Sequence, residues 1–189
     1  MQRFLVVGLG NPGKKYERTR HNVGTDALNL LAKRHGAGLK VGRDRAQVAE
    51  FRLSDEAVVA AVPTTWMNES GEAVGALVRR FKVDASRVII VHDELDLAPG
   101  VVRIKVGGGL AGHNGLKSVS QHLRTDDYVR VRIGVGKPQS KEQGADHVLS
   151  SIPAAERKVL DVAIEVAVDA VERIIALGAE AAMQEFNAR

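Results

Sequence analysis

Short apolar runs that end at glycine or polar residues alternate along the chain with longer amphipathic segments. A continuous apolar run predicts a buried strand, whereas apolar residues three and four positions apart predict a helix. On this basis we expect strands at residues 4–7, 47–53, 57–62, 87–91, 101–106 and 128–135. We expect helices at residues 22–35, 69–81, 113–123 and 153–178.

The order of these elements predicts an α/β fold. Strands alternate with helices over most of the chain, which is typical of a sheet covered by helices. The strands at 47–53 and 57–62 are separated only by a Ser-Asp-Glu turn, which predicts an antiparallel hairpin. We therefore expect a single domain over residues 1–189, with a mixed, mostly parallel, twisted β-sheet surrounded by α-helices.

The last predicted strand, residues 128–135, has a two-faced pattern. Valine and isoleucine alternate in it with Arg130 and Arg132. Because successive side chains of a strand point to opposite faces, this alternation predicts a buried apolar face and an exposed basic face.

Composition narrows the class of protein. The chain has 189 residues, of which 44% are hydrophobic and 26% charged, and it contains no cysteine. Disulfides, zinc-thiolate sites and cysteine nucleophiles are therefore excluded. No apolar run approaches the roughly 18 residues of a membrane span, and the first residues lack the apolar core of an export signal. We expect a cytoplasmic protein.

Charge gives a weaker indication of the partner. The chain carries 27 Lys+Arg against 23 Asp+Glu, a net charge of +4. This balance mildly favours a polyanionic partner, although a solvated basic surface explains it equally well.

The first predicted strand is followed by G-x-G-x-x-G at residues 8–13, which matches the consensus pattern of a dinucleotide-binding fingerprint. That fingerprint needs a helix opening at the glycines and an acidic residue about 20 positions later. Here Pro12 and the polar stretch 14–20 delay the helix, and residues 33–35 are Lys-Arg-His. A P-loop is disfavoured too, because Lys15 stands where serine or threonine must bind magnesium. We expect the glycines to permit close backbone approach instead.

Polar residues recur where predicted strands end or helices begin, the place at which open α/β sheets build their sites. A neutral imidazole such as His21 can take a proton from water if a partner fixes its tautomer, and Asp93 is the natural partner. Asparagine amides could hold a carbonyl or share its developing charge. The residues in such places are Asn11, His21, Asn68, His92, Asp93, His113 and Asn114.

Simpler roles compete with these chemical ones. His21 could cap a helix or lie on the surface, and we expect His92 to be a structural neighbour of Asp93. His113 and Asn114 could form the N-terminus of a helix while also serving a site. A metal site built from His21, Asp93 and His113 has no close ligand spacing such as H-x-x-x-H to support it. We therefore expect no metal and no other cofactor.

Several runs resemble the bacterial peptidyl-tRNA hydrolase family, in order and over almost the whole chain. They are GLGNPGKKYERTRHNVG at 8–24, PTTWMNESG at 63–71, VHDELDLAPG at 91–100, KVGGGLAGHNGLKS at 105–118 and RVRIGVGKP at 130–138. The resemblance implies a metal-free esterase that frees tRNA from prematurely released peptides, acting as a cytoplasmic monomer on peptidyl-tRNA. It also implies a mixed sheet wrapped by helices, in agreement with the pattern of elements.

The resemblance implies roles for individual residues. His21 would activate water and Asp93 would orient His21. Lys105 and Arg132 match the basic pair that grips the tRNA 5′-phosphate; without the resemblance they would be ordinary solvated charges on strands. The residues implied to bind the peptide and the scissile ester, or to line their cleft, are Asn11, Tyr16, Met67, Asn68, His113 and Asn114.

Two positions depart from the family's pattern. Trp66 stands where a smaller aromatic residue is frequent, and Leu110 interrupts the glycine loop. Both substitutions affect the expected width of the substrate cleft.

Two functions of other kinds remain open on the sequence alone. A non-catalytic RNA-binding protein could use the same basic face, and it would bind tRNA without cleaving an ester. A nucleotide-dependent enzyme could use the glycine loop, and NAD or ATP would protect it against heat. A serine hydrolase is disfavoured because the chain has no G-x-S-x-G motif.

Overall fold

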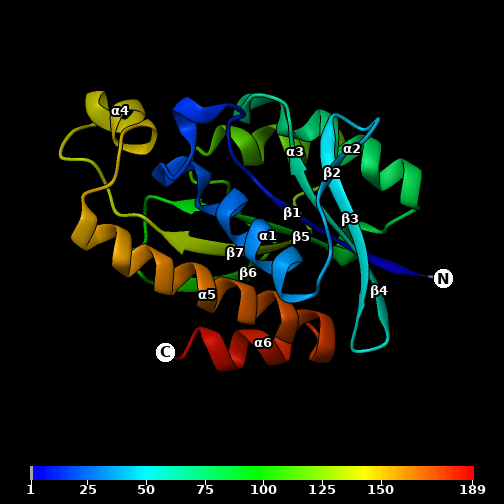
Figure 1. The fold of residues 1–189 in the computed structure, drawn as a ribbon. Helices are drawn as coiled ribbons and strands as arrows, with labels where there is room; N and C mark the ends of the chain where they lie inside the picture. The colour runs from blue at the N-terminus through cyan, green and yellow to red at the C-terminus, as the bar shows by residue number, and fades with distance from the viewer. Residues whose placement is uncertain (1) are drawn as a thin grey trace.

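The computed structural model describes residues 2–189, whose strands form one seven-stranded sheet in the order β2-β3-β4-β1-β5-β7-β6 (Figure 1). The strands are β1 (Arg3–Gly8), β2 (Lys40–Val41), β3 (Ala46–Leu53), β4 (Glu56–Pro63), β5 (Val88–Glu94), β6 (Val102–Val106) and β7 (Val129–Gly134). The helices are α1 (Val23–Arg34), α2 (Ser70–Phe81), α3 (Asn114–Leu123), α4 (Gly144–Leu149), α5 (Ala154–Leu177) and α6 (Ala179–Phe186). The short 3-10 turns that matter below are η2 (Arg20–Asn22) and η3 (Met67–Glu69).

Parallel strands form the centre of the sheet. β1 pairs in parallel with β4 and β5, and β5 pairs in parallel with β7. β3 and β6 run antiparallel to their neighbours, and β3 and β4 form the expected hairpin. The predicted α/β fold with a mixed, mostly parallel sheet is confirmed. The carboxyl ends of the four central strands consequently lie along one edge.

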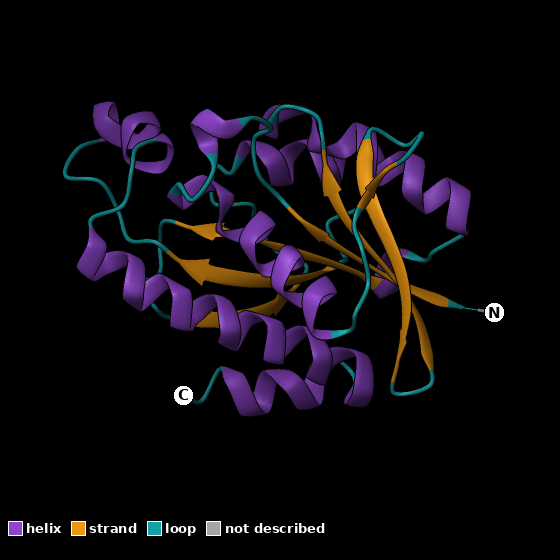
Figure 2. Ribbon diagram, viewed as in Figure 1, coloured by secondary structure: helices purple, strands orange, loops and turns teal. Residues whose placement is uncertain are grey.

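Helices cover both faces of the sheet (Figure 2). Ile89 and Val91 of β5 point into the apolar cluster shared with α1, α5 and α6, whereas Val88 and Ile90 point into the cluster shared with α2 and α3. Burying one such side chain contributes about 1.5–3 kcal/mol, so the two clusters together fix the sheet between its helices. No helix within residues 2–189 has the length and apolar character needed to cross a membrane.

The glycines near the N-terminus serve helix packing. A Cβ atom on Gly8 would lie 2.1 Å from the carbonyl oxygen of Gly24, and one on Gly10 would lie 2.2 Å from Oγ1 of Thr25. Both contacts are with the beginning of α1, which starts only at Val23. The glycines thus let α1 lie against the end of β1, and no helix opens at them as a dinucleotide fingerprint requires.

The structure corrects the expected basic face of β7. Arg130 is buried, and its guanidinium donates to the carbonyl oxygens of Gly108, Gly109 and Asp126. The alternating pattern predicted exposure because it could not show that the glycine loop folds back over this strand. Arg132, two residues later, is half-buried.

Some elements were not expected from the sequence. β5 extends to Glu94, because His92 and Asp93 continue its pairing with β7. The pattern also missed β2, α4 and α6, which are short, and α6 follows α5 after the single residue Gly178.

The end of the chain closes one edge of the sheet. After α6, the side chain of Asn187 accepts from the backbone N–H of Ile104 at 2.8 Å and donates to its carbonyl oxygen at 2.8 Å. This side chain thus satisfies both backbone groups of one residue of β6, on the edge that faces away from β7.

Candidate functional site

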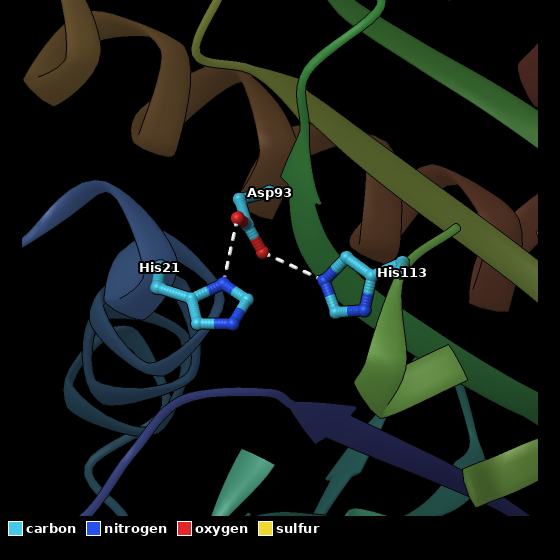
Figure 3. Close-up of side chains that lie close together, drawn as sticks. All are labelled: His21, Asp93 and His113. Carbon is cyan, nitrogen blue, oxygen red and sulfur yellow. Dashed lines mark hydrogen bonds and ion pairs between the residues drawn. The ribbon is translucent and has the colours of Figure 1, made fainter. Parts of the chain in front are cut away.

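Three segments distant in sequence meet around one carboxylate (Figure 3). Asp93 lies near the carboxyl end of β5, His21 lies in turn η2, and His113 is the N-cap of α3. Nδ1 of His21 lies 2.7 Å from Oδ2 of Asp93, and Nε2 of His113 lies 2.8 Å from Oδ1. Each carboxylate oxygen therefore has its own imidazole partner.

The hydrogen bonds determine which ring nitrogens carry protons. Nδ1 of His113 accepts from the backbone N–H of Leu116 at 3.2 Å, so the proton of this ring is on Nε2 and is donated to Asp93. The carboxylate likewise accepts from Nδ1 of His21. Nε2 of His21 is left with its lone pair, and it points away from Asp93 (Figure 3).

Burial and charge shift the pKa values of this group. Burial alone would raise the pKa of Asp93, which is 2% exposed, but the bonds and charges of His21 and His113 hold it well below its usual range. Burial would lower the pKa of His21, but the Asp93 carboxylate outweighs this and raises it above 6.5. Asp93 is thus an anion that favours protonation of His21.

His92 lies next to this group as a structural neighbour. Its ring is fully buried, and Nδ1 donates to the carbonyl oxygen of Asp93 at 2.7 Å. Burial, with the nearby His113, lowers the pKa of His92 to about 3. The ring is therefore neutral at ordinary pH and helps to fix the backbone at Asp93.

Asn11 is held between two loops at the ends of β1 and β4. Its Oδ1 accepts from the backbone N–H of Met67 at 2.7 Å. The side chain of Asn22 bonds to both backbone groups of Asn11, each at 2.9 Å. These bonds orient the Asn11 amide so that its Nδ2 group is the one left to donate to another molecule.

Close packing brings α3 to this loop. A Cβ atom on Gly115 would lie 2.6 Å from Sδ of Met67 and 2.9 Å from Cε1 of His113. Only glycine allows both contacts at this position. Met67 is itself buried, and Ser70 donates to its carbonyl oxygen at 2.6 Å.

A cavity of about 220 Å³ opens beside the histidines. Its walls include His21, Asp93, His113 and Asn114, together with α4. Asn11 lines another cavity, of about 350 Å³. The remaining predicted substrate residues, Tyr16, Met67 and Asn68, are in neither wall.

Two of those remaining residues lie on or near the surface. Asn68 is exposed. Tyr16 packs edge-to-face against Trp66, with ring centroids 5.9 Å apart, and Trp66 is 51% exposed. Trp66, one of the two residues that depart from the family's pattern, therefore forms an accessible aromatic pair with Tyr16, a predicted substrate residue.

Lys105 and Arg132 share a third cavity, of about 150 Å³, whose walls also include His92, Arg130 and Glu94. Antiparallel pairing of β6 with β7 brings Lys105 opposite Arg130 on the same face as Arg132. Oε1 of Glu94 lies 3.9 Å from Arg132. Three cationic side chains thus converge beside His92, with one carboxylate offsetting part of their charge.

The group His21, Asp93 and His113 also has the composition of a metal site, with ligand atoms within 4.8 Å of one another. The nitrogen–oxygen distances of 2.7 and 2.8 Å are those of direct hydrogen bonds. In this arrangement the ring protons occupy the directions in which a metal would need lone pairs.

Two residues that shape the site, Asn22 and Gly115, were not predicted from the sequence. Asn22 fixes the loop of Asn11, and its place directly after His21 was the available signal. Gly115 lies directly after Asn114, but nothing in the sequence shows that two side chains approach it.

The chain is similar to known proteins over nearly its full length. Residues 5–189 match the model of the peptidyl-tRNA hydrolase family. The peptidyl-tRNA hydrolase of Rhodococcus erythropolis is 48% identical over 97% of this chain and 97% of its own, and that of Nocardia farcinica is 50% identical over 97% and 95%. The crystal structure of the Acinetobacter baumannii peptidyl-tRNA hydrolase has a TM-score of 0.94 and 37% identity, and the match covers 98% of this chain and 95% of that one. The chain therefore belongs to the peptidyl-tRNA hydrolase family.

Proposed function

We propose that this protein hydrolyses the ester between a peptide and the 3′-terminal ribose of tRNA, and so recycles tRNA from peptidyl-tRNA released before translation ends. Family membership supports the substrate class. The single observation that carries the chemistry is the bond between His21 Nδ1 and Asp93, because it leaves Nε2 of His21 free to act as a base.

The proposed reaction begins with water beside Nε2 of His21. The imidazole removes a proton as the water oxygen bonds to the ester carbonyl carbon, and Asp93 stabilises the imidazolium that forms. The tetrahedral intermediate then collapses with cleavage of the bond to the ribose oxygen. That oxygen takes the proton from His21, which releases tRNA with a free 3′-hydroxyl and the peptide as a carboxylic acid.

Amide groups provide the polar contacts in this proposal. The oriented Nδ2 of Asn11 and the side chains of Asn68 and Asn114 donate to carbonyl oxygens of the peptide or to the oxyanion. Amides suit this role because they donate without titrating. Met67 and Tyr16 contribute apolar contacts, and His113 keeps Asp93 anionic and oriented.

Lys105 and Arg132 bind the 5′-phosphate of the tRNA in this proposal. The position of both side chains in the wall of one cavity supports this assignment, because a phosphate there would meet two cationic groups. Contacts of this kind release counterions from the nucleic acid, so affinity falls as salt concentration rises. Glu94 competes for Arg132 in the free protein and is displaced when the phosphate binds.

We further propose that the enzyme acts without a metal, as a monomeric single domain, in the cytoplasm. Direct hydrogen bonds within the histidine–aspartate group support the metal-free route. The monomeric state is what the resemblance to the family implies. The cytoplasm is where ribosomes produce the substrate.

The test compares cleavage of N-acetylated and free aminoacyl-tRNA by enzyme treated with a chelator and then diluted into magnesium buffer, which keeps the tRNA folded. We expect rapid cleavage of the acetylated substrate, little of the free one, and no effect of the treatment. Loss of activity that zinc restores would contradict the metal-free route. Binding of tRNA without cleavage would instead indicate a non-catalytic RNA-binding protein.

A further inference from the structure

Arg20, the residue directly before His21, has a buried side chain with three polar contacts. Its Nε and one terminal nitrogen donate to the two carboxylate oxygens of Glu156 at 3.1 and 2.9 Å. The other terminal nitrogen donates to the carbonyl oxygen of His147 at 2.9 Å. One guanidinium thus joins turn η2 to the first turn of α5 and to α4. None of these contacts belongs to the proposed proton transfer.

Helix α4 is held mainly by polar contacts. None of its residues, Gly144–Leu149, is buried, so it has little apolar packing of its own. Its second anchor is the ring of His147, whose Nε2 donates to the carbonyl oxygens of Val135 and Gly136 at 3.3 and 3.0 Å. The bidentate bond to Glu156 fixes the Arg20 guanidinium on α5, and the remaining nitrogen then holds α4 through one charge-assisted bond to the carbonyl oxygen of His147.

The same helix forms one wall of the cavity beside the histidines. Gly144, Ala145 and Val148 line this cavity together with His21 and His113. In Figure 1, α4 lies at one end of the molecule, above the start of α5. The position of this wall therefore depends on few contacts, and one of them comes from the residue next to His21.

We propose that Arg20 is a positioning residue that holds α4 against the substrate cavity. The inference rests on the proposed function, because it takes the cavity to receive the acyl part of peptidyl-tRNA. The bond between His21 and Asp93 does not involve Arg20. Loss of the guanidinium therefore weakens substrate binding and leaves proton transfer almost unchanged.

The test uses Arg20→Met and Arg20→Lys, with Arg34→Met as a matched control. Arg34 also joins another helix to α5, through Asp169 and Glu172, but it does not touch α4. For Arg20→Met we expect KM for N-acetyl-aminoacyl-tRNA to rise about tenfold, the equivalent of one charge-assisted hydrogen bond. We expect an unchanged pH midpoint of kcat, partial rescue by lysine, and wild-type constants for the control.

Hydrogen exchange gives a readout that does not depend on ester cleavage. We expect the backbone amides of α4 to exchange faster in Arg20→Met than in the wild type or the control, while those of β5 do not change. If Arg20→Met does not fold, the double variant Arg20→Met/Glu156→Leu removes both charges and leaves no unpaired carboxylate. It is expected to show the same rise in KM and the same exchange.

Different outcomes would overturn different statements. A fall in kcat with an unchanged KM, or a shifted pH midpoint, would show that Arg20 acts on His21 rather than through α4. Unchanged exchange in α4 would remove the anchoring role. A wild-type protein without esterase activity would refute the proposed function, and the exchange measurement would still decide whether Arg20 holds α4.

Discussion

The rings of His21 and His113 lie with their centroids 5.3 Å apart and their planes inclined by 47°, yet the two are not chemically equivalent. Both nitrogens of His113 are engaged, one with Asp93 and the other with Leu116. Within the described part of the chain, His21 bonds only through Nδ1. Of the two histidines, His21 is therefore the one able to accept a proton from water.

Replacement of His21 by alanine tests this assignment. We expect kcat to fall by about 100-fold to 10,000-fold, the usual contribution of a general base, with tRNA affinity nearly unchanged. Single-turnover cleavage and tRNA titration measure the two quantities. His35→Ala is the matched control, because His35 also bonds to a carboxylate, Glu172, at 2.7 Å and lies outside the site. Retained turnover in the His21 variant would assign the base to another group.

The Asp93→Asn variant should change the pH dependence of the reaction. Since the base must be unprotonated, activity of the wild type rises with pH through the pKa of His21, which Asp93 raises above 6.5. Asparagine has no negative charge to raise the pKa of His21, while burial still lowers this pKa. We therefore expect the midpoint of kcat/KM to move to lower pH, with a lower plateau because the tautomer is no longer fixed. A midpoint that stays in place would show that His21 is not the titrating group.

Lys105→Ala and Arg132→Ala should weaken tRNA binding through lost charge. We expect KM to rise for each, and the log-log slope of binding against salt to fall by about one unit for each phosphate contact removed. Lys33→Ala is the control, since Lys33 is exposed near the end of α1 and is not a wall residue of the cationic cavity. If the salt slope is the same in all three variants, the phosphate lies elsewhere.

Gly115→Ala should disturb the site through packing alone. The added methyl group would meet Sδ of Met67 and the His113 ring, and such overpacking typically costs about 1–3 kcal/mol of stability. We expect a lower melting temperature together with reduced kcat, because the beginning of α3 must shift. Gly38→Ala is the control, since its Cβ would meet nothing within 4 Å. Equal behaviour of the two variants would contradict the packing argument.

Sequence patterns located the elements better than the contacts between them. The strands on either side of Asp93 and the polar residues at their ends were predictable because burial and turn formation are local properties. The sequence also suggested that Asp93 pairs with His21. It did not suggest that His113 shares the carboxylate, because that depends on how the glycine loop directs α3 toward β5.

The partners of charged residues were the contacts that the sequence predicted least well. Arg130 and Arg132 follow the same alternation, but only Arg130 is enclosed by backbone carbonyl groups. Arg20 reaches Glu156, which lies 136 residues away in the chain. Such partners are set by the packing of whole elements, so a single sequence contains no local signal for them.

The Asn187 side chain bears on how the protein behaves at high concentration. By bonding to both backbone groups of Ile104 it takes the place that a strand of another molecule could occupy. Exposed strand edges are templates for aggregation. In this protein the Asn187 amide covers part of the exposed edge of β6, the edge strand on the side of the sheet opposite the β3–β4 hairpin. Variants that lose this amide would be expected to self-associate through β6 even if their chemistry were intact.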